Sequence, residues 1–192
     1  MDWRHLSELT LAGKAAYDRQ LNLCVWTKTN AGMGSFYRSQ HELFMVFAKG
    51  GAPHRNNVQL GRFGRSRSNV WSYPGANNFG RGESGSGEGN PLAMHPTVKP
   101  TALIADILLD ASVRGDIVAD PFMGSGTTII AAEKLRRRAR GIELDPLYCD
   151  TIIRRWQAWT GEQAIRVGDG ALFDAIEAAA TAGEPATDGG DL

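Results

Sequence analysis

The clearest hydrophobic pattern lies at residues 116–145. A short apolar run at 117–119 leads into a glycine-containing turn. An apolar-periodic segment follows at 128–135, and then comes a second short apolar run that ends in acidic residues. Short apolar runs bounded by turn residues are typical of buried strands, whereas the periodic segment is typical of a helix. The pattern therefore predicts a strand, a loop, a helix and a parallel strand.

Weaker patterns predict the other elements. A helix is predicted at 146–159, because Asp145 is a good N-cap, Pro146 suits the first helical position and Gly161 is a typical helix end. The two strands nearest the amino terminus are joined by a long polar loop, and antiparallel pairing is their simplest arrangement. Periodicity and alternation predict further helices at 6–18 and 101–111 and strands at 21–26, 42–48, 69–73 and 164–167.

The order of these elements suggests four regions. Residues 50–94 are loop-rich, and a long loop-rich insert in a compact domain is usually functional or disordered. The first part of the insert is expected to face nucleic acid, and residues 80–89 resemble a flexible linker. The regions are a catalytic or base-pocket portion at 1–49, a basic target-recognition insert at 50–94, a cofactor-binding half at 95–177 and a disordered acidic tail at 178–192.

Composition narrows the class of protein. The 192 residues suffice for one domain with a hydrophobic core, and 42% of them are hydrophobic. Cys24 and Cys149 are too few for a disulfide framework or a four-cysteine zinc site, so we expect no metal. No secretory or membrane-spanning pattern occurs, which favours the cytoplasm. The net charge is zero, yet residues 43–82 contain no acidic residue and several arginines.

The glycine loop indicates a nucleotide-type site. Gly124 and Gly126 allow the backbone to approach a ligand closely, and the free N–H groups of the next helix would face it. Glu143 ends the second strand, where an acid commonly accepts hydrogen bonds from ribose hydroxyls. Ile129 stands where the dinucleotide fingerprint requires a third glycine, and no phosphate-binding Gly-Lys-Ser/Thr loop occurs. A nucleoside ligand without phosphates remains.

The sequence Asp-Pro-Phe-Met-Gly-Ser-Gly-Thr-Thr at 120–128 resembles the S-adenosylmethionine motif of DNA methyltransferases that modify exocyclic amines. His-Pro-Thr-Val-Lys-Pro at 95–100 and Gly-Ile-Glu-Leu-Asp at 141–145 occur in the order of the circularly permuted class. The resemblance implies an α/β, Rossmann-like three-layer sandwich, whose mixed sheet has one antiparallel strand. It also implies that S-adenosylmethionine is held by Thr97, Lys99, Asp120, Phe122, Gly124, Ser125, Gly126, Thr127, Glu143 and Asp145.

Simpler interpretations exist for several of these residues. Lys99 suits the carboxylate of the cofactor, but a solvated surface lysine is the alternative. Asp120 starts an Asp-Pro sequence, which favours a turn in any protein. The basic run at 134–140 invites a DNA-binding interpretation, although cations at the end of a helix also stabilise the helix dipole.

Two groups of residues are candidates for contact with double-stranded DNA. In the resembling family the first strand pair borders the pocket for an extruded base, and aromatic side chains there would stack on that base. Lys28, Phe36, Tyr37 and Arg38 are the candidates, with packing of the aromatic rings on the core as the alternative. Arg62, Arg65 and Arg67 suit phosphate contacts or guanine recognition, with a soluble loop as the alternative.

The catalytic motif of this family is not found in the sequence. Proton removal from the amine is the task of an Asp-Pro-Pro-Tyr type tetrapeptide, and no such tetrapeptide occurs among the 192 residues. We therefore expect an N-terminally truncated enzyme without catalytic residues of its own, dependent on a homodimer or on a complementing N-terminal fragment. The alternative function is an inactive remnant that binds cofactor or DNA only. Adenine or cytosine as target, and a restriction, phage or orphan role, stay open.

Overall fold

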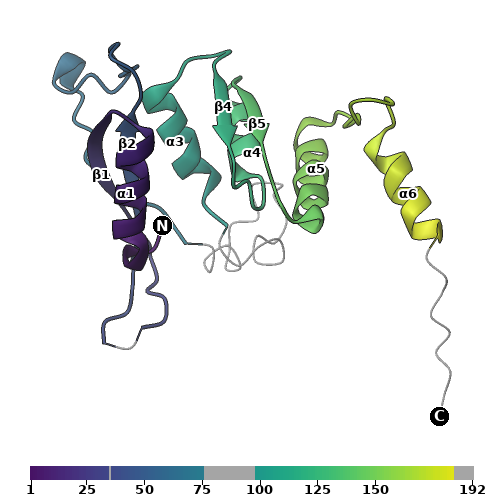
Figure 1. Cartoon of the computed structure of the whole chain (residues 1–192), viewed down its shortest axis with the longest axis horizontal. Helices are drawn as coiled ribbons and strands as arrows, with labels where there is room; N and C mark the ends of the chain where they lie inside the picture. The colour runs from purple at the N-terminus through teal and green to yellow at the C-terminus, as the bar shows by residue number, and fades with distance from the viewer. Residues whose placement is uncertain (35, 76–97, 184–192) are drawn as a thin grey trace.

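The computed structural model describes residues 1–34, 36–75 and 98–183, and it combines two small sheets with helices (Figure 1). In chain order the elements are η1 (Trp3–His5), α1 (Leu6–Ala16), β1 (Arg19–Thr27), β2 (His41–Ala48), η2 (Arg62–Gly64), β3 (Val70–Ser72), α3 (Thr101–Ala111), β4 (Ile117–Asp120), α4 (Thr127–Lys134), β5 (Arg138–Gly141), α5 (Pro146–Thr160) and α6 (Phe173–Gly183).

The first sheet is mixed, with strand order β2-β1-β3. β1 and β2 form the predicted antiparallel pair, and β3 pairs in parallel with the end of β1. The indole of Trp26 is buried, and its Nε1 donates a hydrogen bond to the carbonyl oxygen of Tyr73 at 3.0 Å. α1 lies against β2, where a Cβ atom on Gly13 would overlap the ring of Phe47. An α/β protein with a mixed sheet and one antiparallel strand is therefore confirmed.

The second sheet is the predicted strand-loop-helix-strand unit. β4 and β5 are parallel and in register from Ile117↔Arg138 to Asp120↔Gly141, with α4 as the crossover. α3 packs against α4 and connects this unit to the first sheet. The Nδ2 atom of Asn57 donates to the carbonyl oxygens of Leu109 and Ser112 at 2.8 Å each, so the segment after β2 lies at the carboxyl end of α3.

Two predictions near the carboxyl terminus are wrong. No strand forms at 164–167, because Ile165 makes only a single bridge to Leu172 and Val167 is 99% exposed. Nor does a disordered tail begin at 178, because α6 continues to Gly183 through an alanine-rich run that has high helix propensity. The rest of that predicted tail lies outside the described residues.

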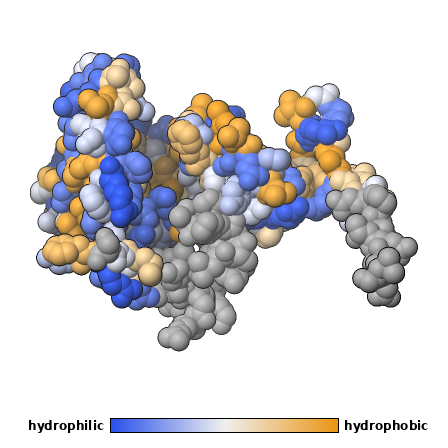
Figure 2. Space-filling model, turned by 60° about the horizontal axis from the view of Figure 1, so that its bottom comes forward, coloured by the Kyte–Doolittle hydropathy of each residue, from blue (hydrophilic) through white to orange (hydrophobic). Residues whose placement is uncertain are grey.

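β4 has an open edge in the described part of the chain, where its only strand neighbour is β5. Parallel strands are normally buried on both faces, yet Ile117 at the start of β4 is 59% exposed. Apolar side chains are also exposed at several places on the face shown in Figure 2. Within the described residues, no helix has the length and hydropathy needed to span a membrane.

Candidate functional site

A cavity of about 650 Å³ lies at the carboxyl ends of β4 and β5. It is bounded by the loop from β4 to α4, by the residues that follow β5, by the start of α3 and by Phe44 of β2. Most of the residues predicted to hold the cofactor line it, namely Lys99, Asp120, Phe122, Gly124, Ser125, Thr127 and Glu143. The structure thus brings together residues that are up to 44 positions apart in the sequence.

Glu143 fastens the glycine loop to the end of β5. Its Oε2 atom accepts a hydrogen bond from the Gly124 backbone N–H at 2.6 Å. Its Oε1 atom accepts from the N–H groups of Leu144 at 2.9 Å and Asp145 at 3.1 Å. A carboxylate held by backbone donors keeps a fixed direction, which suits an acceptor for two neighbouring hydroxyl groups.

Asp120 has the turn role that its sequence context suggests, and it also lines the cavity. Its Oδ1 atom accepts from the N–H of Phe122 at 3.0 Å, and its Oδ2 atom accepts from the hydroxyl of Thr128 at 2.6 Å. Gly126 follows with a φ of +81°, and a Cβ atom there would lie 3.0 Å from Ile152. Glycine is therefore required for the chain to enter α4 so close to α5.

Arg155 is a buried residue of this site that sequence reasoning missed. From α5, its Nη1 atom donates to the Ser125 carbonyl oxygen at 3.1 Å and to the Thr127 hydroxyl at 3.4 Å. Its Nη2 atom donates to the hydroxyl of Thr101 at 3.4 Å. Arg155 is only 8% exposed, so the guanidinium joins the glycine loop, α3 and α5 from beneath the cavity.

Lys99 enters the cavity from the other side and belongs to a charged cluster. The Nζ atom of Lys28 donates to Glu42 Oε1 at 2.6 Å, and Glu42 Oε2 lies 3.7 Å from Lys99 Nζ. Burial raises the pKa of Glu42, but the hydrogen bond from Lys28 and the nearby positive charges outweigh it, and the pKa lies below its ordinary value. Lys28, expected to contact DNA, thus pairs with Glu42 and lies over the ring of Trp26.

Three predicted cofactor residues do not line the cavity. Asp145 caps α5, where its Oδ1 atom accepts from the N–H of Leu147 at 2.9 Å. Gly126 shapes the loop from behind, and Thr97 lies outside the described residues. Of the lining residues, Ser125 and Thr127 are buried in the loop scaffold, whereas Phe122 is 88% exposed.

The aromatic residues predicted to border a base pocket lie elsewhere. Phe36, Tyr37 and Arg38 belong to the loop between β1 and β2, which projects from the body of the molecule (Figure 1). Both rings are more than 80% exposed, and neither contributes to the cavity. They are therefore neither packed on the core nor part of a base pocket within the described residues.

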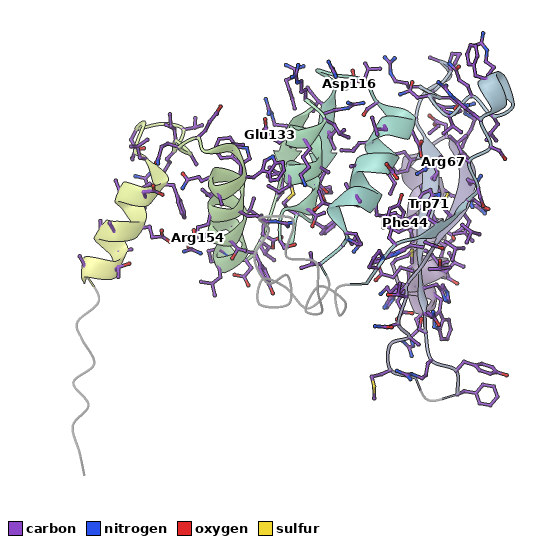
Figure 3. The ribbon with its side chains drawn as sticks, turned by 180° about the vertical axis from the view of Figure 1, so that it is seen from behind. Phe44, Arg67, Trp71, Asp116, Glu133 and Arg154 are labelled. Atoms are coloured by element: carbon purple, nitrogen blue, oxygen red, sulfur yellow. The ribbon has the colours of Figure 1, made fainter. Side chains whose placement is uncertain are left out.

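The three arginines of the insert lie at the far end of the molecule from the glycine loop. Arg65 donates to the carbonyl oxygen of Asn57 at 3.0 Å, beside the carboxyl end of α3, and Arg62 is close by in η2. Arg67 is held inside, with Nε at 2.5 Å from Asp110 Oδ2 and the guanidinium over Trp71 (Figure 3). A DNA-contact role for Arg67 does not fit this position, because its charge is already paired within the protein.

Comparison with known proteins identifies the relatives of this chain. The DNA methylase family model N6_N4_Mtase matches residues 19–154. The orphan methyltransferase M.BamHII of Bacillus amyloliquefaciens is 39% identical over 97 residues, which make up 50% of this chain and 34% of that protein. The type II methyltransferase M2.MboI of Moraxella bovis is 29% identical over 147 residues, 73% of this chain and 50% of that protein. The chain thus spans half or less of the length of these relatives.

Solved structures agree in fold. The M1.HpyAVI–SAM complex superposes with a TM-score of 0.64 and 25% identity, over 81% of this chain and 71% of that one. A DNA modification methylase of Thermus thermophilus, TTHA0409, complexed with S-adenosyl-L-methionine, gives 0.57 and 27%, over 83% and 62%. The fold is the Rossmann-like methyltransferase fold. Because the family model matches well over half of the sequence, the chain belongs to the N6_N4_Mtase family of DNA methylases.

Proposed function

We propose that this chain forms the cofactor-binding and DNA-facing part of an S-adenosylmethionine-dependent methyltransferase, which modifies the exocyclic amine of adenine N6 or cytosine N4 in double-stranded DNA. The observation that carries the proposal is the convergence of Glu143, the glycine loop and Lys99 on one cavity, in a member of a DNA methylase family. The reaction would take place in the cytoplasm, as expected from the sequence.

The residues around the cavity fit the proposed cofactor in their chemistry. Glu143 offers a fixed carboxylate for the ribose hydroxyls, and Lys99 offers a cation for the amino-acid carboxylate. Exposed apolar side chains beside the cavity, those of Phe122, Ile142 and Leu144, suit the adenine ring. When bound, the cofactor supplies an electrophilic methyl group, and these residues orient that group toward the amine.

Transfer to an amine also requires an acceptor for the amine proton, and we propose that a complementing segment provides it. The open edge of β4 is the place where such a segment would add a strand, since its backbone donors and acceptors have no strand partner there among the described residues. The exposed Ile117 side chain would then be covered. A second copy of the chain is the other partner that this edge accommodates.

Calorimetric titration with S-adenosylmethionine tests the cofactor site directly. Hydrogen bonds to a charged group contribute about 1.5–3 kcal/mol, so Glu143→Ala should weaken binding by about 10-fold to about 150-fold. The matched control is Glu133→Ala on α4, whose carboxylate accepts from Trp156 Nε1 away from the cavity (Figure 3) and whose loss should leave the affinity unchanged. Wild-type protein that fails to bind, or equal affinities in the three proteins, would reject the cofactor site.

Methyl transfer separates an enzyme from a binding remnant. With tritiated S-adenosylmethionine and unmethylated DNA, we expect no transfer by the chain alone. Transfer should appear after addition of an N-terminal methyltransferase segment that carries the Asp-Pro-Pro-Tyr tetrapeptide. Transfer by the chain alone would disprove the need for complementation, and no transfer with any such segment would favour the remnant.

A further inference from the structure

The loop between β1 and β2, residues 28–40, ends in a tip with large exposed side chains. Met33 is 93% exposed, Phe36 85% and Tyr37 82%. The two rings contact each other edge to face, with centroids 4.4 Å apart. Single exposed apolar residues are common on protein surfaces, but three together on one projecting loop mark an interaction site. We call this group the loop tip.

Hydrogen bonds hold the loop in a defined shape. Arg38 donates from Nε to the Gly32 carbonyl oxygen and from Nη2 to that of Ala31, at 3.0 Å each. The Gly32 N–H donates across the loop to the Ser39 carbonyl oxygen at 2.7 Å. A Cβ atom on Gly34 would lie 2.2 Å from the carbonyl oxygen of Tyr37. The loop tip is therefore presented in advance, which lowers the entropic cost of binding.

The loop leaves the first sheet at the end that faces the cavity. Lys28 at its start contacts Glu42, and Glu42 approaches Lys99, which lines the cavity. Figures 1 and 3 both show the loop extending beyond the sheet, with side chains at its end pointing away from the body. A partner bound over the cavity would meet the loop tip.

Charge indicates what kind of partner that is. From Arg19 to His41 the sequence contains no aspartate or glutamate, while Lys28 and Arg38 lie within the loop. A surface that combines apolar side chains with positive charge and lacks carboxylates suits a polyanion with stackable rings. This description fits DNA.

We infer that the loop tip of Met33, Phe36 and Tyr37 is a wedge that enters the base stack of the bound duplex. The inference rests on the proposed function, and it gives the aromatic pair a role outside the base pocket. Apolar side chains inserted at a base step unstack it partly and kink the duplex. The wedge would thereby help to open the duplex near the cavity, where a base has to leave the stack to be modified.

Fluorescence anisotropy with the full chain tests the wedge. Two labelled unmethylated duplexes of the same sequence are compared at low salt, one fully paired and one with a central mismatch. The double variant Phe36→Ala/Tyr37→Ala should bind about 5-fold to about 150-fold more weakly. A wedge also predicts that wild type prefers the mismatched duplex, because its bases are already partly unstacked, and that the double variant loses this preference.

Phe63→Ala is the matched control, because Phe63 is also an exposed aromatic residue, lies near Arg62 and Arg65, and is found at the far end of the molecule. Its DNA affinity should equal that of wild type. If wild type binds DNA and the double variant binds both duplexes equally well, the wedge is refuted and the proposed function stands. If wild type binds no DNA, both fail. A self-association that sedimentation velocity detects in wild type alone would instead identify the loop tip as a contact between copies.

Discussion

Replacing Arg155 with methionine tests whether the buried guanidinium stabilises the site. Of its three hydrogen bonds, the one to the Ser125 carbonyl oxygen at 3.1 Å is the shortest, and the two at 3.4 Å are long for N–H donors. A buried carbonyl deprived of a charged donor costs about 1–3 kcal/mol, and removal of the buried charge returns part of the loss. We expect the free energy of unfolding to fall by about 2 kcal/mol.

Urea unfolding followed by circular dichroism measures this change. With a slope of about 2 kcal/mol per molar urea, the midpoint should fall by about 1 M. The affinity for S-adenosylmethionine should fall too, because the carbonyl of Ser125 is no longer held in place. Arg154→Met is the control on the same helix; its partly exposed ion pairs with Asp150 and Glu177 contribute less than about 1 kcal/mol (Figure 3). Equal midpoints for the two variants would refute the reasoning.

Two further predictions concern the loop and the charged cluster. Gly126→Ala should destabilise the protein by more than Gly115→Ala in the same urea assay, because both glycines have a φ near +80° but only at Gly126 would the new Cβ atom meet a neighbour, Ile152 at 3.0 Å. Equal losses would contradict the predicted contact. In an NMR pH titration, the pKa of Glu42 should lie below 4.5 and should rise in Lys28→Met. Since the folded pKa is depressed, the Glu42 contribution to stability is present above pH 4.5 and is lost as the pH falls through the folded pKa; an unchanged pKa in the variant would contradict this.

Local signals in the sequence predicted the cofactor unit well. Asp145, Pro146 and Gly161 placed both ends of α5 within a residue, because caps and helix stops depend on nearby atoms only. The order of β4, the glycine loop, α4 and β5 follows in the same way from short-range patterns. The segment at 164–167 has a similar alternation, but a strand also needs a neighbour, and the sequence did not reveal that Val167 has none.

The parts that could not be predicted depend on contacts between distant segments. The burial of Arg155 looks implausible from its polarity, and only the positions of the loop and α3 explain it. Arg67 resembles its neighbours Arg62 and Arg65 in the sequence, yet Asp110, 43 positions away, pairs with it alone of the three among the contacts described. Glu42 likewise acquires its importance from Lys28 and Lys99, which come from separate segments.

The positions of Lys99 and the loop tip give the cavity a direction. Lys99 is tied through Glu42 to Lys28, and Lys28 is the first residue of the loop that ends in Phe36 and Tyr37. The cavity and the exposed rings are thus linked by one chain of ionic contacts about Glu42. A ligand carboxylate that pairs with Lys99 would weaken its contact with Glu42 and leave Glu42 to Lys28. Occupation of the cavity should therefore be felt at the base of the loop, and cofactor and DNA should bind with coupled affinities.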